Sequence, residues 1–218
     1  MRNNNFKQEY LRRAKTVAFW LQLTPFVRMV GLNGSLARGE AKKSSDIDFF
    51  IVLKKDRIWL GRMGVTLMTQ LSGYRRHGHK IAGMICLNRY QTDDFLTIWP
   101  HNEYHARDYC GLIPLVDIDN TYAQYFKKNV WTKKFGCPMK ENRDQIVSSN
   151  WILTGLRHFQ EKIWGGRFGD GWEKMAKKYQ KRRILRDKRT MTAPVGKIRV
   201  SDQELCFHPP KGVDKLVR

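Results

Sequence analysis

The sequence predicts an α/β fold, in which a small mixed sheet with flanking helices is followed by a mainly helical C-terminal part. Two apolar runs, residues 27–32 and 49–53, have the length and the bounding polar residues of buried strands. Residues 6–21 and 58–71 carry apolar side chains at helical spacing. Further helical patterns follow residue 100. Strands and helices that alternate in this way indicate a sheet covered by helices.

The two helices predicted in the first half of the chain have recognisable ends, and a third strand follows them. Three asparagines at residues 3–5 mark the start of the first helix, which ends before Thr24 and Pro25. The helix over residues 58–71 is ended by Gly73. The apolar run at residues 81–88 is the expected third strand of the sheet.

The second half of the chain is expected to be helical and basic. The helical patterns cover residues 103–112, 121–130, 151–164 and the segment after 171. Gly165 and Gly166 end one helix, and Asp170 is the expected cap of the next. A short strand is expected at residues 197–200. We therefore expect one domain over residues 1–100, and a helical, basic region over residues 101–218.

A pattern of small and acidic residues lies between the first two predicted strands. Gly34 and Ser35 follow the first strand, and Asp46 and Asp48 begin the second. Because side chains alternate along a strand, both carboxylates should project to the same face. Two ionised carboxylates that lie this close repel each other unless a cation lies between them, and Mg2+ prefers such oxygen ligands. Gly34 allows close approach of an anion, and Arg38 adds a guanidinium suited to phosphate.

This pattern, GSLARGEAKKSSDIDFFIV, resembles the signature of the nucleotidyltransferase superfamily with the DNA polymerase β-like fold, and is most similar to its minimal branch. The resemblance implies that Gly34 and Ser35 bind the triphosphate of a nucleoside triphosphate (NTP) and that Arg38 contacts it. It also implies that Asp46 and Asp48 are the catalytic residues and hold two Mg2+ ions. A nucleoside monophosphate would then pass to an acceptor, and pyrophosphate would leave.

The third strand departs from the pattern of that family. Members usually carry a third acidic residue there, whereas this chain has no Asp or Glu between Asp56 and Asp93. The candidates that could replace it are Asn88, Asp93, Asp94 and Glu103.

The net charge of the chain indicates the kind of partner that it would bind. The net charge is +21, from 41 basic and 20 acidic residues, so a polyanionic partner such as RNA is plausible. Residues 177–189 form a dense basic run, which either follows a phosphate backbone or is a solvated helix face. The sequence shows no signal peptide and no apolar run of membrane-spanning length, so we expect a cytoplasmic protein without a membrane partner.

The sequence therefore predicts a Mg2+-dependent nucleotidyltransferase that binds ATP or another NTP. The acceptor hydroxyl, on RNA or tRNA, a protein or a small molecule, and the oligomeric state are left open. The alternative is a catalytically weak nucleotide- or RNA-binding module, such as an antitoxin-like partner protein, because the third acid is missing.

Overall fold

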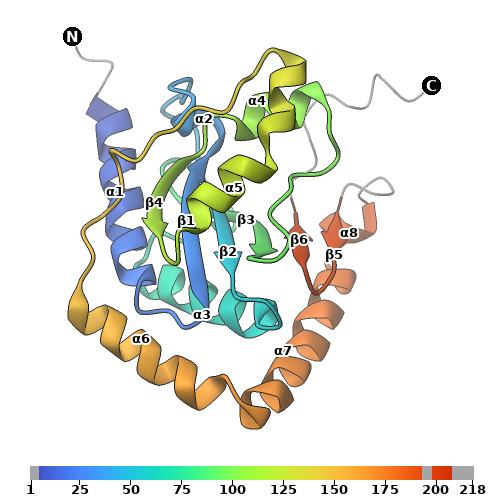
Figure 1. Ribbon diagram of the computed structural model, residues 1–218. Helices are drawn as coiled ribbons and strands as arrows, with labels where there is room; N and C mark the ends of the chain where they lie inside the picture. The colour runs from blue at the N-terminus through green and yellow to red at the C-terminus, as the bar shows by residue number, and fades with distance from the viewer. Residues whose placement is uncertain (1–4, 193–197, 208–218) are drawn as a thin grey trace.

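The computed structural model describes residues 5–192 and 198–207, which form a six-stranded mixed sheet with helices on both faces (Figure 1). The strands are β1 (Val27–Asn33), β2 (Ile47–Leu53), β3 (Ile85–Thr92), β4 (Ile113–Asp117), β5 (Arg199–Val200) and β6 (Glu204–Cys206). The helices in this part of the chain are α1 (Asn5–Leu21), α2 (Gly34–Ala37), α3 (Ile58–Leu71), α4 (Glu103–Tyr109), α5 (Thr121–Lys128), η1 (Val130–Phe135), α6 (Trp151–Trp164), α7 (Arg167–Arg186) and α8 (Lys188–Thr192). This arrangement confirms the predicted α/β fold.

The strand order is β4-β1-β2-β3-β6-β5. β1 pairs antiparallel with β2 and with β4, whereas β2 and β3 are parallel. Parallel neighbours need a crossover connection, and α3 provides it. The N-terminal ends of β2 and β3 therefore lie side by side, next to the C-terminal end of β1.

Alternating side chains of β2 divide the core into two layers. Ile47, Phe49 and Ile51 belong to the layer beneath α1 and α3. Phe50 and Val52 belong to the opposite layer, which packs against α4, α5 and η1. Figure 1 shows α5 crossing one face of the sheet, with α3 on the other side. The sheet is thus covered on both faces, and its strand ends are left to form a site.

α1 ends at Leu21, before Thr24 and Pro25, and α3 spans Ile58–Leu71, as predicted. The third strand was predicted too early, because it was expected over residues 81–88 and β3 begins at Ile85. The Met84 N–H donates to the Ile81 carbonyl at 3.1 Å, and Gly83 has a φ of 65°, so residues 81–84 form a turn. The strand runs instead through polar residues that are buried by partners far away in the sequence. Local pattern cannot indicate such a strand.

The segment between the helices predicted at residues 103–112 and 121–130 contains a fourth strand, β4, which was not predicted. It pairs only with β1 among the described strands and forms one edge of the sheet. Proline is tolerated on an edge strand because its missing N–H is not needed by a second neighbour. β4, β5 and β6 bring the second half of the chain into the same sheet. The domain boundary at residue 100 stays a prediction.

The helical C-terminal part is confirmed, with one change in a helix start. α7 begins at Arg167, with Gly166 in the N-cap position, so Asp170 is not the cap. Asp170 lies in the first turn and forms an ion pair with Arg57 at 2.5 Å. Its carboxylate joins α7 to the loop before α3.

The outer faces of α6 and α7 are unusually apolar. Leu153 and Arg157 are the buried residues of α6, and most of its other large apolar side chains face solvent. The exposed apolar residues of the two helices include Trp151, Ile152, Leu156, Phe159, Ile163, Phe168, Trp172, Met175 and Tyr179. An extensive exposed apolar surface of this kind is typical of an interaction site.

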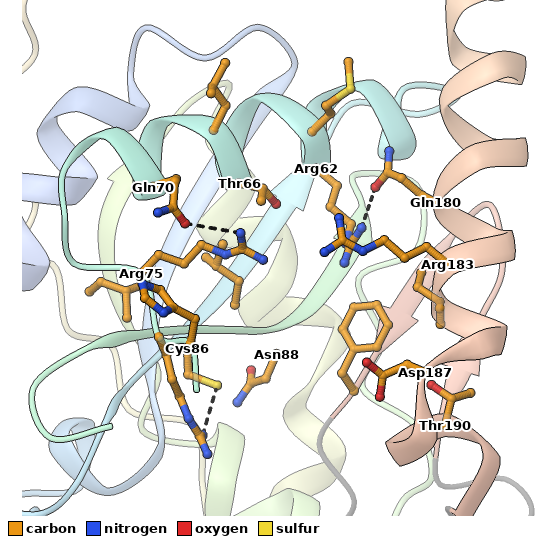
Figure 2. Close-up of a pocket in the computed structure, with 18 of the residues that line it drawn as sticks. Arg62, Thr66, Gln70, Arg75, Cys86, Asn88, Gln180, Arg183, Asp187 and Thr190 are labelled. Carbon is orange, nitrogen blue, oxygen red and sulfur yellow. Dashed lines mark hydrogen bonds between the residues drawn. The ribbon is translucent and has the colours of Figure 1, made fainter. Parts of the chain in front are cut away.

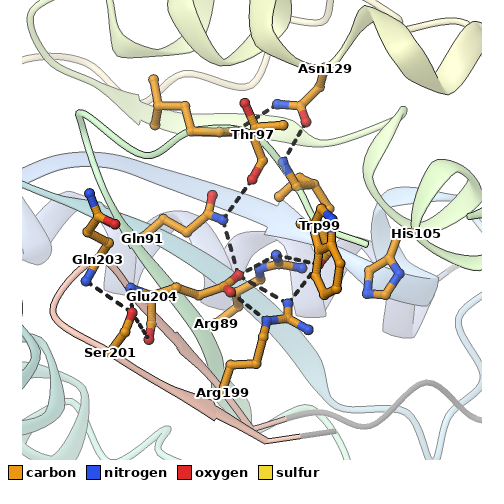
Figure 3. Close-up of polar contacts among 12 residues, drawn as sticks. Arg89, Gln91, Thr97, Trp99, His105, Asn129, Arg199, Ser201, Gln203 and Glu204 are labelled. Atoms are coloured by element: carbon orange, nitrogen blue, oxygen red, sulfur yellow. Dashed lines mark hydrogen bonds and ion pairs between the residues drawn. The ribbon is translucent and has the colours of Figure 1, made fainter. Parts of the chain in front are cut away.

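Glu204 attaches the short β5–β6 pair to the sheet (Figure 3). Its buried carboxylate accepts hydrogen bonds from Arg89 and Gln91 of β3 and from Arg199 of β5. The Arg89 guanidinium is almost fully buried, and it lies 4.8 Å from the centre of the Tyr109 ring. This polar cluster explains why the second half of β3 is a strand although its sequence is polar.

Parts of three predictions lie outside the described residues: the helix start at residues 3–4, residue 197 of the short strand, and the side chains of Lys188 and Arg189 in the basic run. Among the described residues, no helix has the combination of length and apolar character needed to span a membrane.

Candidate active site

Three neighbouring strands bring the motif residues to one end of the sheet. Asn33 of β1 is paired with Asp48 of β2, and Asp48 is paired with Cys86 of β3. Gly34 follows Asn33 directly and opens the short helix α2. The pairing of β1, β2 and β3 therefore sets the positions of these groups.

Asp46 and Asp48 lie on the same side of β2, as expected from strand alternation. One carboxylate oxygen of each and the Cys86 sulfur lie within 4.8 Å of one another. A sequence search for a third acid would pass over Cys86, because the residue is not acidic. Its position is nevertheless directly beside Asp48 in the pairing of β2 and β3.

The two aspartates have different partners. Arg76 Nη1 donates to Asp46 Oδ2 at 2.5 Å and contacts the Cys86 sulfur at 3.6 Å. Asn88 Nδ2 donates to Asp48 Oδ1 at 2.7 Å. Asp46 thus has a cation beside it, whereas Asp48 has a neutral amide.

The electrostatics of the site reflect this difference. Burial, together with the charges of Asp46 and Asp108, raises the pKa of Asp48 to about 7. Burial and the charges of Asp48 and Asp46 raise the pKa of the Cys86 thiol to about 12. Both shifts disfavour a further negative charge beside Asp46.

A divalent cation fits the two carboxylates. Hard cations take oxygen ligands, and a bound cation would stabilise the ionised form of Asp48 that burial disfavours. The neutral thiol of Cys86 is a poor third ligand for Mg2+, because sulfur suits softer metals. Asp46 and Asp48 are therefore the residues that would hold Mg2+, with water or phosphate oxygens completing its coordination.

Gly34 lies against Asp48. It has a φ of 70°, and a Cβ at this position would meet Asp48 Oδ2 at 2.2 Å. No other residue type fits, because a side chain would be strained by the backbone and would clash with the carboxylate. Ser35, the next residue, lies half-buried in α2, and its carbonyl accepts a hydrogen bond from the Glu40 N–H at 2.8 Å. An anion at this turn would lie beside the cation site.

Arg38 has carboxylate partners. Its guanidinium forms ion pairs with Asp108 and, at 3.0 Å, with Glu40. Asp108 also accepts a hydrogen bond from Asn33 Nδ2 at 3.1 Å. Sequence reasoning missed Asp108, because it lies on α4, about sixty residues from the motif, and carries no local signal. A triphosphate contact by Arg38 would have to compete with these two acids.

The candidates for the third acid lie in different parts of the structure, and only some lie near Asp46 and Asp48. Asn88 lies in the site, on Asp48. Asp93 and Asp94 follow the C-terminal end of β3, where the Asp93 N–H donates to the carbonyl of Leu53 at 2.9 Å. Because β2 and β3 are parallel, this is the opposite end of the sheet from Asp46. Glu103 is the first residue of α4.

A cavity of about 640 Å3 adjoins the site (Figure 2). It lies between α3 and α7, over the beginning of β3, and Arg76, Cys86 and Asn88 line it. These three residues also contact or belong to the aspartate cluster. The cavity and the candidate metal site therefore share residues at the beginning of β3.

A model of a known protein family matches the part of the chain that contains this site. Residues 13–107 match the family model described as the nucleotidyltransferase domain. This match is consistent with the nucleotidyltransferase superfamily and confirms the resemblance carried by the Gly-Ser and Asp-x-Asp motif. The matched segment, less than half of the chain, contains Gly34, Asp46, Asp48 and Cys86. No curated protein and no solved structure matched the chain.

Proposed function

We propose that this protein is a Mg2+-dependent nucleotidyltransferase that moves a nucleoside monophosphate from an NTP to an acceptor hydroxyl. One observation carries the proposal: within a nucleotidyltransferase domain, the carboxylates of Asp46 and Asp48 lie together, and Gly34 lies against Asp48. A cation between the two carboxylates, with phosphate approaching the backbone at Gly34, would meet the two requirements of the reaction.

The motif residues would bind and orient the NTP. Asp46 and Asp48 would hold two Mg2+ ions, Gly34 and Ser35 would approach the triphosphate, and Arg38 would add a cationic contact. Bound Mg2+ supplies electrostatic stabilisation of the charge on the transferring phosphoryl group. The acceptor oxygen forms a bond to the α-phosphorus, the bond to the bridging oxygen of the β-phosphate breaks, and pyrophosphate leaves with that electron pair. The hydroxyl proton passes to solvent, since the third group of the cluster is the neutral thiol of Cys86 and not a carboxylate.

The test measures both products of the reaction. The protein is incubated with each of the four NTPs, labelled at the α-phosphate, together with Mg2+, total RNA and protein. We expect label in an acceptor and release of pyrophosphate, and neither for Asp46→Asn or Asp48→Asn. Asp94→Asn, which removes a carboxylate at the opposite end of the sheet, is the matched control and should keep the wild-type rate. Wild-type transfer by Asp48→Asn would refute the proposal.

The alternative function, a binding module that acts as a partner protein, is favoured by the exposed apolar face of α6 and α7. Cys86 as the third group of the cluster points the same way, because a thiol is a poor ligand for Mg2+. Nucleotide binding without Mg2+-dependent release of pyrophosphate would support this alternative. RNA as a partner and a cytoplasmic location stay predictions.

A further inference from the structure

The cavity between α3 and α7 lies over the part of β3 that is between the segments paired with this strand. β6 pairs with residues 89–91 of β3. Residues 74–76 form backbone hydrogen bonds with Ile85 at the beginning of the same strand. Phe207 donates its N–H to the Asn88 carbonyl at 2.8 Å, just beyond the end of β6. The stretch of β3 between these contacts forms the floor of the cavity, and α3 and α7 are its walls (Figure 2).

Arginines dominate the charge of this cavity. Arg62 from α3, Arg75 from the loop after α3 and Arg183 from α7 extend over the same space (Figure 2). None of the three forms an ion pair with an acid among the described residues. Asp187 is the single acidic residue among the described residues that line the cavity. The arrangement is suited to an anion.

The burial and the incomplete hydrogen bonding of Arg62 also favour an anion in the cavity. Burial lowers the pKa of its guanidinium, and the neighbouring charges of Arg75 and Arg183 lower it further. Arg62 Nη1 donates to Gln180 Oε1, but its buried Nε has no hydrogen-bond partner in the described part of the chain. An anion in the cavity would offset the repulsion among the three cations.

Apolar and aromatic groups lie around the same opening. Tyr179 of α7 is 64% exposed, and Met63 and Leu67 of α3 are also exposed at the rim. The Phe207 ring centre lies 5.0 Å from the Arg62 guanidinium carbon. Cations with aromatic rings between them are typical of sites that follow a phosphate backbone and stack its bases.

α7 continues the positive charge beyond the cavity. Lys178, Lys181, Arg182 and Arg186 are exposed on this helix. These four residues are not among the described residues that line the cavity, which a mononucleotide or a small phosphate could fill. A polynucleotide would contact both, because its charges are repeated along the chain.

We propose that the cavity between α3 and α7 binds the end of a single-stranded nucleic acid, with phosphodiesters on Arg62, Arg75 and Arg183 and a base on Tyr179. Its terminal hydroxyl would lie toward Asp46 and Asp48, so the nucleic acid is the acceptor. The role as acceptor rests on the proposed function, whereas binding to the cavity does not.

Binding is measured first, in EDTA and without NTP, by fluorescence anisotropy of labelled 12-nucleotide RNA and DNA of one sequence. We expect the double variant Arg75→Gln/Arg183→Gln to lose about tenfold or more in affinity, and the log–log slope of its salt dependence to fall by about 1.4, or about 0.7 for each lost contact with a single strand. Arg12→Gln/Lys162→Gln removes the same charge from exposed positions on α1 and α6 and should lose much less. Comparison of the RNA and DNA arms identifies the sugar that is preferred. Equal losses in the two double variants would overturn the proposal.

Two further measurements separate a polynucleotide site from other sites. Tyr179→Ala, which keeps every charge, should weaken binding about tenfold through lost stacking. AMP and inorganic pyrophosphate should compete poorly with the labelled chain, and competition at equal affinity would overturn the proposal in favour of a small-anion site. Mg2+ and labelled NTP are added last. Cavity-dependent binding without transfer of label would refute the proposed function and leave the binding site in place.

Discussion

Gly34 and Asp48 are packed so closely that a Cβ on Gly34 would lie 2.2 Å from the Asp48 carboxylate oxygen Oδ2. The contact joins the turn after β1 to the first residues of β2. It places the backbone that would approach phosphate directly beside the group that would hold a cation. A change at position 34 should therefore disturb both functions.

Gly34→Ala should reduce nucleotidyl transfer by about a hundredfold, the usual effect of moving a reacting group by roughly an ångström. Gly39→Ala is the matched control, because Gly39 has a φ of 73° but a Cβ added there would meet no atom within 4 Å. Each alanine costs about 1–2 kcal/mol from its left-handed backbone conformation. Steady-state kinetics and thermal unfolding of both variants distinguish the two effects. Equal activity in the two variants would show that the contact with Asp48 is unimportant.

Asp48→Asn should stabilise the protein at pH 8 in EDTA. The folded-state pKa of Asp48, about 7, lies above its unfolded value of 3.8. Between these two pH values the folded protein binds a proton on Asp48 that the unfolded chain does not bind. The stability that this proton contributes is present at low pH and is lost as the pH rises through about 7. The asparagine variant avoids this loss, which we expect to be on the order of 4 kcal/mol, because the pKa rises from 3.8 to about 7.

Mg2+ provides the corresponding control for that variant. Ligand binding to the folded state raises the free energy of unfolding. Wild type should therefore gain stability from Mg2+ at pH 8, whereas Asp48→Asn should gain little. Chemical denaturation at pH 4 and pH 8, with Mg2+ and with EDTA, measures these differences. A variant that is less stable than wild type in EDTA at pH 8 would contradict the prediction.

His105 should make the protein less stable in mild acid. Its buried ring contacts Asn102 Oδ1 at 2.8 Å, and burial with the charges of Arg89 and Arg199 lowers its pKa to about 4, against a smaller opposing effect of Glu204. A folded pKa below the unfolded value means that the unfolded chain binds more protons. Stability should fall as the pH drops from about 6.5 to about 4, by about 1.4 kcal/mol per pH unit at most.

His105→Gln removes this titration and keeps a side-chain donor. The free energy of unfolding of wild type and variant, measured by urea denaturation between pH 4 and pH 7, should differ in slope within this window. His101→Gln is a suitable control, because His101 stacks on Trp131 at an exposed position. Parallel curves for wild type and His105→Gln would disprove the titration of a buried histidine.

Those parts of the site that are local could be predicted from the sequence. Gly34, Asp46 and Asp48 lie on one turn and at the start of one strand, so spacing and strand alternation were enough to place the two carboxylates together. Asp108 and Arg76 reach the site from α4 and from the loop after α3, and only the folded chain brings them there. The start of β3 was misplaced for the same reason, since Arg89 and Gln91 are buried by Glu204, more than 110 residues away. Local pattern reports which residues prefer to be buried, but not which distant partner makes burial of a polar residue possible.

The last prediction concerns Cys86, which stands beside Asp48 in the register of β2 and β3. Its sulfur is close enough to share a metal with Asp46 and Asp48, but its pKa of about 12 keeps it a neutral thiol near pH 7. Cys86→Asp would provide a third hard oxygen ligand, whereas Cys86→Ser has similar size and no charge. The two variants therefore separate ligand chemistry from packing.

We expect Cys86→Asp to bind Mg2+ about tenfold more tightly than wild type and to transfer nucleotide faster, because each added carboxylate strengthens binding of a hard cation. Cys86→Ser should change Mg2+ affinity little. Thiophilic Cd2+ should give the ultraviolet absorption of a metal–thiolate bond in wild type and lose it in Cys86→Ser, since the thiol deprotonates on binding a soft metal. Mg2+ affinity is measured by calorimetry, and transfer by release of pyrophosphate. If Cys86→Asp binds Mg2+ no better than Cys86→Ser, position 86 does not face the metal, and the missing third carboxylate must be sought on another element.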